Sequence, residues 1–348
     1  MIKPARTLAV ASVTMSLALV ASACGGGHAK KTPTPTPTPS SSSATSSAAP
    51  TPTKAAALAV NPLTGGKPTN HPVVAVKIDD TANGRPQVNI DSADIVYVEQ
   101  VEGGLTRLIA VFHTNLPTVE AVRSVRANDP ELLAQYGPIG FAASGGAPNP
   151  LFVLDHSSLR ASINDRGGAG FARDGSRGAP YNLTANLAAV AAAVHAGPAK
   201  DVGFVWSAAA QNQLGGAAVR TSIHTVVGGT SVDFVWNARL GRYVRYIDGV
   251  AQHQSSGEPV ATPNVIVQFC QVTPYPQDVD VVGNVAQFTH SVGSGRVVVF
   301  RNGHRIVGTW HRRSDGSSTS FLNSSGNPIP LMPGGAWVIL VATNAPLS

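Results

Sequence analysis

The sequence predicts a fold of the α+β or α/β class, in which an N-terminal mixed α/β sheet domain is followed by a β-rich C-terminal domain. In the first part, short apolar runs rich in β-branched residues alternate with helical segments. After about residue 217, strand-like runs separated by turn residues continue to the end, and no helical pattern of any length appears. These observations predict domains at residues 61–215 and 216–348.

The strands predicted for the first domain are apolar runs bounded by turn residues, and they cover residues 71–79, 93–100, 106–113 and 140–146. A helix is expected over 128–137, because Pro130 stands in its first turn and Gly137 follows its last. The Ala-rich segment 184–197 predicts a second helix. Residues 164–180 form a long polar, Gly-rich loop, of a kind that is often functional.

The second domain is predicted from hairpin signals. Residues 232–249 contain two β runs that favour a hairpin, and 264–272 indicate a buried strand. Asn302-Gly303 lies between two further β runs, which is the strongest short-range signal for a tight hairpin turn. A closing strand is expected over 334–343.

The N-terminus, "MIKPARTLAVASVTMSLALVASACGGG", has the features of a secretory signal. A basic start with Lys3 and Arg6 precedes an apolar stretch over residues 8–20, which is too short to span a membrane. The following "VASAC" resembles a bacterial lipobox, so residues 1–23 are expected to be removed and Cys24 to carry the lipid that anchors the protein to the membrane. The alternative is ordinary secretion with a free Cys24.

Residues 24–60 are rich in Pro, Thr, Ser and Ala and have little apolar surface to bury, which predicts a disordered tether. Fully extended, the stretch would reach about 110 Å, whereas a flexible coil would span about 35 Å. A tether of this kind would hold the globular part away from the membrane on its extracytoplasmic face.

Charge and cysteine content limit the function further. The chain carries a net charge of +6, without a basic helix or a basic-aromatic platform, so no nucleic acid partner is predicted. No spacing typical of a metal site or a cofactor motif is present, so neither group is expected. With Cys24 lipidated, Cys270 has no partner for a disulfide and is expected to be a small buried residue.

A cluster of charged residues is the candidate site. In "AVRSVRAND", Arg123 and Arg126 stand close together in a chain with only 13% charged residues. Guanidinium groups bind carboxylate and phosphate bidentately, and the carboxyl ends of strands tend to share one ligand-binding edge of a sheet. The residues expected there are Asp79, Arg85, Glu102, Arg107, Arg123, Arg126 and Ser144. The simpler alternative is that the arginines only pair with Glu99 or Glu102 as structural ion pairs.

Several motifs occur in one order that resembles the YerB-like lipoprotein family. They are "VKIDDTANGRPQ", "ADIVYVEQVEGGLTRLIAVF", "VRSVRAND", "GRYVRYIDG", "TPNVIVQ", "FRNGHRIVGTWHR" and "PGGAWVILV". The resemblance covers nearly all of the globular part and implies a lipid-anchored, two-domain envelope protein. It implies no biochemical mechanism.

Two functions from different classes remain. The favoured one is a non-catalytic binding or regulatory module of the cell envelope, which contacts a cell-wall polymer or a membrane-bound envelope protein through the Arg/acid-lined site. The alternative is an extracytoplasmic hydrolase or transferase that acts on wall glycan or peptide. Its acid and base would come from a pair among Asp79, Asp80, Glu99 and Glu102. No known hydrolase motif supports the second hypothesis directly.

Overall fold

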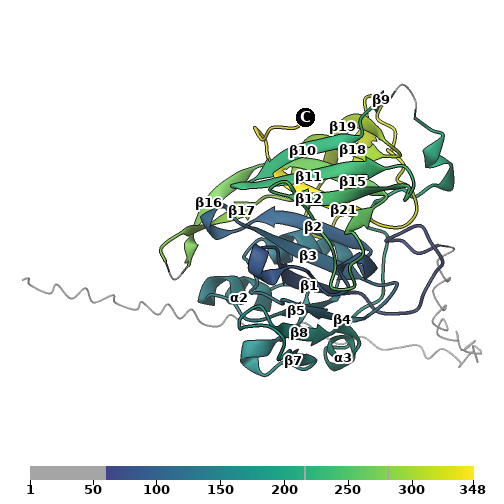
Figure 1. Ribbon diagram of the computed structural model, residues 1–348. Coiled ribbons are helices and arrows are strands. Elements are labelled where there is room, and N and C mark those ends of the chain that lie inside the picture. The colour runs from purple at the N-terminus through teal and green to yellow at the C-terminus, as the bar shows by residue number, and fades with distance from the viewer. Residues whose placement is uncertain (1–59, 215–216, 281) are drawn as a thin grey trace, which may run out of the picture. The chain divides into compact units, whose positions relative to one another are not determined.

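A mixed sheet of 11 strands forms the centre of the protein in the computed structural model, which describes residues 60–214, 217–280 and 282–348 (Figure 1). The predicted leader, Cys24 and nearly all of the tether lie outside the described residues, because these begin at Val60.

The strands of this sheet come from both halves of the chain. Their spatial order is β20 (Ser320–Asn323), β19 (His304–Arg312), β18 (Gly293–Arg301), β15 (Asn264–Cys270), β21 (Ala336–Ala342), β2 (Ile95–Gln100), β3 (Thr106–Phe112), β1 (Val74–Asp79), β5 (Gly140–Ala143) and β6 (Arg160–Ile163), and β9 (Ala218–Val219) pairs with β19. The two halves meet where β2 pairs in parallel with β21, with Val96 opposite Trp337. The two segments on either side of residue 215 therefore share one continuous sheet.

Three smaller sheets complete the fold. They contain β10 (Ser222–Val227), β11 (Thr230–Asn237), β12 (Arg242–Ile247), β13 (Val250–Ala251) and β14 (Ala261–Thr262) in the first, β16 (Val272–Val279) and β17 (Val285–Thr289) in the second, and β4 (Thr118–Glu120), β7 (Phe171–Arg173) and β8 (Leu183–Asn186) in the third. The β16–β17 hairpin extends outward beyond the central sheet (Figure 1).

The helices are short, and this corrects the expected fold class. The α-helices of the described residues are α1 (Asp129–Leu133), α2 (Pro148–Asp155) and α3 (Leu187–Ala193). They are too short to form the helical layers of an α/β domain, so the described chain is predominantly β, with its β-rich second half as predicted.

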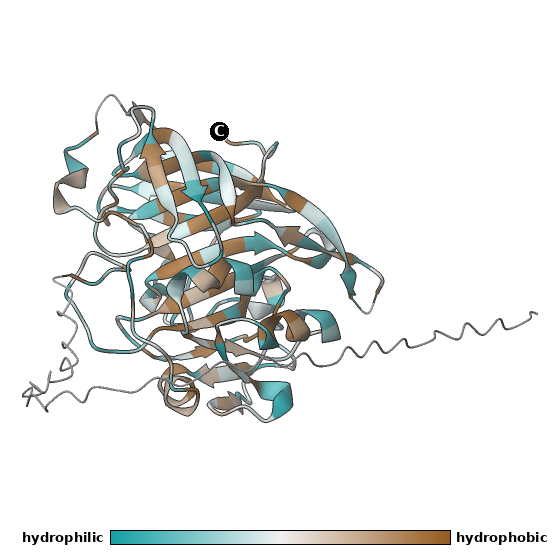
Figure 2. Cartoon of the chain, turned by 180° about the vertical axis from the view of Figure 1, so that it is seen from behind, coloured by the Kyte–Doolittle hydropathy of each residue, from teal (hydrophilic) through white to brown (hydrophobic). Residues whose placement is uncertain are grey.

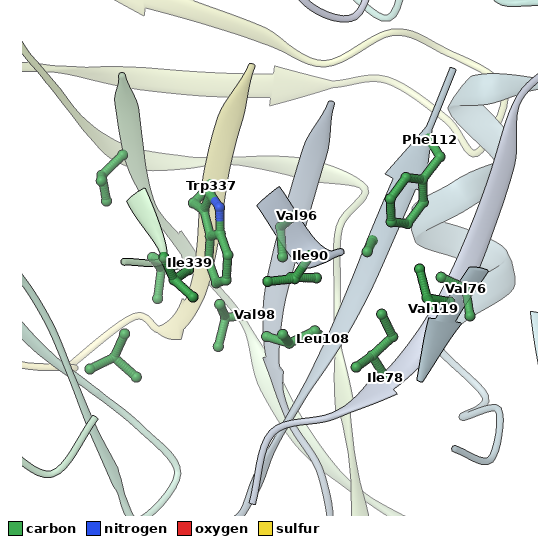
Figure 3. Packing of buried hydrophobic residues seen from close by; sticks show 14 of the residues in the cluster. Val76, Ile78, Ile90, Val96, Val98, Leu108, Phe112, Val119, Trp337 and Ile339 are labelled. Atoms are coloured by element: carbon green, nitrogen blue, oxygen red, sulfur yellow. The ribbon is translucent and has the colours of Figure 1, made fainter. Parts of the chain in front are cut away.

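Buried side chains alternate between the two faces of the central sheet. In β1, Val74, Val76 and Ile78 face one core cluster, which also contains Val96 and Trp337 (Figure 3). Ala75, which lies between Val74 and Val76, faces a second cluster on the opposite face. Because side chains alternate in a strand, a central strand buried on both sides carries apolar residues on both faces. Brown hydrophobic segments recur along the strands of the central sheet (Figure 2), although β1 also contains the buried Lys77 and Asp79.

The predicted strands and hairpins of both halves are present, including the turn at Asn302-Gly303, whose φ angles of +49° and +72° suit a tight hairpin. The helix expected over 128–137 is α1 followed by a 3₁₀ turn, which ends before Gly137. The helix expected over 184–197 was partly wrong. Its first residues belong to β8, and Asn186 then caps α3 by accepting a hydrogen bond from the backbone N–H of Ala189 at 3.0 Å.

Candidate functional site

The segments that carry the predicted site residues end at one edge of the central sheet. β1 and β2 both pair antiparallel with β3 and so run in the same direction, and β5 runs parallel to β1. The C-terminal ends of β1, β2 and β5 therefore lie at the same edge as the start of β3. Asp79 in β1 and Glu99 in β2 each stand opposite Arg107 of β3 in the strand registers.

The segment containing Arg123 crosses this edge in an extended conformation. The backbone N–H of Arg123 donates to the carbonyl of Lys77 at 2.9 Å. Two residues later, the N–H of Val125 donates to the carbonyl of Gly145 at 2.9 Å. The segment thus joins the end of β1 to the turn after β5 and places Arg123 in front of the sheet edge.

Arg123 pairs with Asp79. The distance from Arg123 Nε to Asp79 Oδ2 is 3.3 Å, and the guanidinium carbon lies 5.3 Å from the centroid of the Tyr181 ring. The other Asp79 oxygen accepts hydrogen bonds from the backbone and side chain of Thr81 at 2.7 and 2.6 Å. One donor, Arg123 Nη1, is buried without a hydrogen-bond partner among the described residues.

Arg126 pairs with Glu102. Nη2 donates to Oε2 at 2.5 Å, and Nε lies 2.5 Å from Oε1. Glu102 follows β2 in a tight turn formed by Gly103 and Gly104, at φ of +63° and +73°, a conformation that favours glycine. Burial would raise the pKa of Glu102, but the hydrogen bond and charge of Arg126 hold it below its ordinary value.

Arg107 differs from these two arginines because none of the described acidic side chains forms an ion pair with it. Its Nη1 donates to the carbonyl of Ser124 at 3.3 Å. In the described part of the chain, no carboxylate oxygen lies within 4.0 Å of its guanidinium nitrogens. Burial and the positive charges of Arg126 and Arg123 lower its pKa, and the negative charges of Glu102 and Asp79 oppose this shift only in part.

These side chains line one cleft of about 460 Å³. The predicted site residues that line it are Asp79, Glu102, Arg107, Arg123 and Arg126. Ser144 lies beside it, with its hydroxyl 3.3 Å from the hydroxyl of the lining residue Ser124. Arg85 lies outside this cleft, where it donates to Thr81 O at 3.1 Å and Gln252 Oε1 at 2.9 Å.

The other carboxylates considered for catalysis are sealed within the protein. Asp80 is bound by Arg245, and the Glu99 side chain contacts the Lys77 ammonium, which also lies 2.7 Å from Asp129. All these charged side chains are at most 1% exposed. Of the two acidic partners considered for the arginines in structural ion pairs, Glu102 pairs with Arg126, whereas Glu99 pairs with Lys77.

Sequence reasoning missed Asp278 and Tyr181, which also line the cleft. Asp278 comes from β16, and its Oδ2 is buried without a hydrogen-bond partner among the described residues. Burial raises its pKa, although the charge of Arg126 opposes the shift. No local signal could have identified either residue, because each is more than 50 positions from the arginines along the chain.

Cys270 is the last residue considered as a reactive group. Cys270 is buried, and burial raises the pKa of its thiol to about 12, so it behaves as the small apolar residue that was expected. Among the residues that the structure describes, no group of three His, Cys, Asp or Glu side chains could hold a metal ion. No helix in the same residues is long and apolar enough to cross a membrane.

The structure defines a class of β-rich protein. Two consecutive segments of the chain share one sheet, and a cluster of arginines lines the cleft at the edge of that sheet. The chain belongs to the DUF3048 family. Residues 61–200 match the "Protein of unknown function (DUF3048) N-terminal domain", and residues 222–338 match the corresponding C-terminal domain.

Relatives agree with this assignment. The chain is 26% identical over 300 residues to the "Putative lipoprotein YerB" of Bacillus subtilis (strain 168), a match that covers 80% of this chain and 85% of the relative. The crystal structure of the YerB protein from Bacillus subtilis has a similar fold, with a TM-score of 0.70 at 22% identity over 83% of this chain and 99% of that one. The resemblance expected from the sequence motifs is confirmed.

Proposed function

We propose that this protein is a lipid-anchored, extracytoplasmic binding module whose cleft holds an anionic group of a cell-wall polymer. The observation that carries the proposal is the position of Arg107, which lines the cleft and has no carboxylate within 4.0 Å among the described residues. The anchor is supported by the lipobox around Cys24 and by the name of the Bacillus relative.

An unpaired guanidinium favours an anionic ligand for energetic reasons. Arg107 is half-buried, and even partial burial of a cation is costly unless an opposite charge compensates it. A phosphate or carboxylate in the cleft would supply that charge and could accept two parallel hydrogen bonds from Arg107. The unpartnered Nη1 of Arg123 offers a further donor.

The carboxylates support binding over catalysis. Asp79 and Glu102 line the cleft, but each is paired with an arginine. Asp80 and Glu99 are buried against cations. A general acid must donate a proton to the substrate, and each of these four carboxylates is instead in contact with a cationic side chain of the protein.

The test is binding of the full-length protein, purified in detergent, to purified cell-wall fragments and to inorganic phosphate. We expect Arg107→Gln to lower affinity at least tenfold, about 1.4 kcal/mol. Arg107→Lys should restore part of it, since charge returns without the bidentate geometry. The matched control is Arg313→Gln, an exposed arginine outside the cleft. Equal binding by wild type and Arg107→Gln would contradict the proposal.

One observation favours a second candidate function, the extracytoplasmic hydrolase or transferase. Asp278 faces the same cleft with an unpartnered carboxyl oxygen and a raised pKa, which are properties of a general acid. If this function is correct, the protein should release soluble products from wall material, and Asp278→Asn should abolish the release. Binding without product release would support the first proposal.

A further inference from the structure

We infer that the anion site continues into a second cleft, so that its ligand is an extended polymer with regularly repeated anionic groups rather than a single small ion. This inference rests on the proposed function and specifies its ligand. The observation behind it is that Tyr181 lines two clefts, the one containing Arg107 and a neighbouring one of about 400 Å³.

The second cleft is basic. Arg85 and Arg177 line it, together with Asn83 and Tyr181, and no acidic side chain does so among the described residues. Arg177 lies 3.5 Å from the buried Glu120 and donates to the carbonyl of Gly84 at 3.2 Å, so it is held by the protein.

Arg85, like Arg107, donates hydrogen bonds to uncharged acceptors. It donates to a backbone carbonyl and to the amide oxygen of Gln252, but no carboxylate in the described ranges lies within 4.0 Å of it. It is partly exposed, and it also lines a third cleft of about 460 Å³ with residues of the C-terminal half. Each of the two clefts that share Tyr181 therefore contains one arginine with which no acidic side chain of the described residues forms an ion pair.

Tyr181 lines both of the clefts that contain these two cations. Its hydroxyl accepts a hydrogen bond from Asn83 at 3.3 Å, and the Arg123 guanidinium lies over its ring. An aromatic ring held in this way offers a flat surface for the apolar face of a sugar or polyol unit. Arg107, the Tyr181 ring and Arg85 thus match a ligand chain in which an uncharged unit links successive anionic groups.

Binding at two such positions makes affinity depend on ligand length. Once one anionic group of a chain is bound at Arg107, the next is held near Arg85 at a high effective concentration. A small anion can occupy only one of the two positions. A polymer long enough to pass Tyr181 should therefore bind much more tightly than its own repeating unit.

The experiment uses the full-length protein in detergent and galacturonate oligomers from the monomer to the dodecamer, which carry one carboxylate per sugar. Inorganic polyphosphate of matched lengths separates phosphate from carboxylate recognition. For at least one of the two probes, we expect affinity to rise more than tenfold between the monomer and an oligomer that spans both clefts. Arg85→Gln should remove most of this gain, and Arg313→Gln should keep all of it.

The outcomes separate this inference from the proposed function. Equal length dependence in wild type and Arg85→Gln, or no length dependence at all, would overturn the inference and leave a single anion site at Arg107. Equal binding of wild type and Arg107→Gln at every length, or no binding of either probe, would contradict the proposed function itself. If Arg85→Gln does not fold, as judged by its thermal unfolding, Tyr181→Leu provides the second variant and should lower the gain with length.

Discussion

Asp80 and Arg245 form a bidentate ion pair that joins the two halves of the protein. Arg245 Nη1 donates to Asp80 Oδ1 at 2.9 Å and Nη2 donates to Oδ2 at 2.7 Å, across a separation of 165 residues. Both side chains are buried, and the guanidinium also lies 4.7 Å from the Trp337 ring centroid. Because Asp80 directly follows Asp79, this pair fixes the backbone beside the candidate cleft.

Removing Arg245 should strongly destabilise the fold. Arg245→Met would leave the Asp80 carboxylate buried without its partner, which costs about 3–5 kcal/mol in the free energy of unfolding. Urea unfolding followed by circular dichroism measures this loss. The double variant Asp80→Leu, Arg245→Met removes both charges and should be more stable than the single variant. A loss below about 1 kcal/mol for Arg245→Met would contradict this role.

The gathering of Asp79, Glu102 and Arg107 could be predicted from the sequence, because each lies at the end or the start of a recognisable apolar strand. Those strands run in directions that bring the residues to one edge. Asp278 and Arg245 could not be predicted, because their contacts depend on how the second half of the chain packs against the first. No local pattern encodes that arrangement.

The overestimate of helix also has a physical cause. Leu183–Asn186 precedes an Ala-rich run, and Leu and Ala favour helix. In the folded protein this stretch is β8, which pairs with β4 on one side and β7 on the other. Backbone pairing on both sides thus outweighs local propensity, which is a weak preference that tertiary contacts often override.

Glu102 should make stability depend on pH under acidic conditions. The pKa of Glu102 is held below its ordinary value of 4.5, because the hydrogen bond and charge of Arg126 outweigh the effect of burial. The ionised pair therefore stabilises the protein fully above about pH 4.5, and this contribution is lost as pH falls through the lowered pKa.

Thermal unfolding of wild type and Glu102→Gln across this range checks the prediction. The difference in unfolding temperature should be largest near neutral pH and should shrink below pH 4.5, where protonated Glu102 resembles glutamine. Asp155→Asn is the control, because its pair with Arg166 is about half exposed and should contribute little. A difference that stays constant with pH would count against the assignment.

Lipidation at Cys24 should decide where the protein resides. Cys24→Ser removes the sulfur that would carry the lipid, so the mature chain should move from the membrane fraction to the soluble extracytoplasmic fraction. Fractionation and immunoblotting measure this shift, and Cys270→Ser should leave the distribution unchanged. Equal membrane retention of wild type and Cys24→Ser would show that another feature anchors the chain.

Asp278 should oppose anion binding in the cleft. Its carboxylate places a negative charge near the guanidinium groups, and its pKa is raised chiefly by burial. As pH falls through this raised pKa, Asp278 becomes neutral, the cleft becomes more positive and anion affinity should increase. Asp278→Asn should therefore bind wall fragments several-fold more tightly than wild type at neutral pH and should lose much of this pH dependence.

Titrations of both proteins between about pH 7 and pH 4 provide the measurement. Asp280→Asn is the matched control, because Asp280 lines the same cleft, but its carboxylate already accepts hydrogen bonds from the backbone N–H of Val282 and the side-chain amide of Asn284. Removing its charge should change affinity less than Asp278→Asn does. Weaker binding by Asp278→Asn would mean that the carboxyl contacts the ligand as a donor or acceptor. Loss of product release together with intact binding would instead favour the hydrolase or transferase, because a general acid is needed for the reaction and not for the complex.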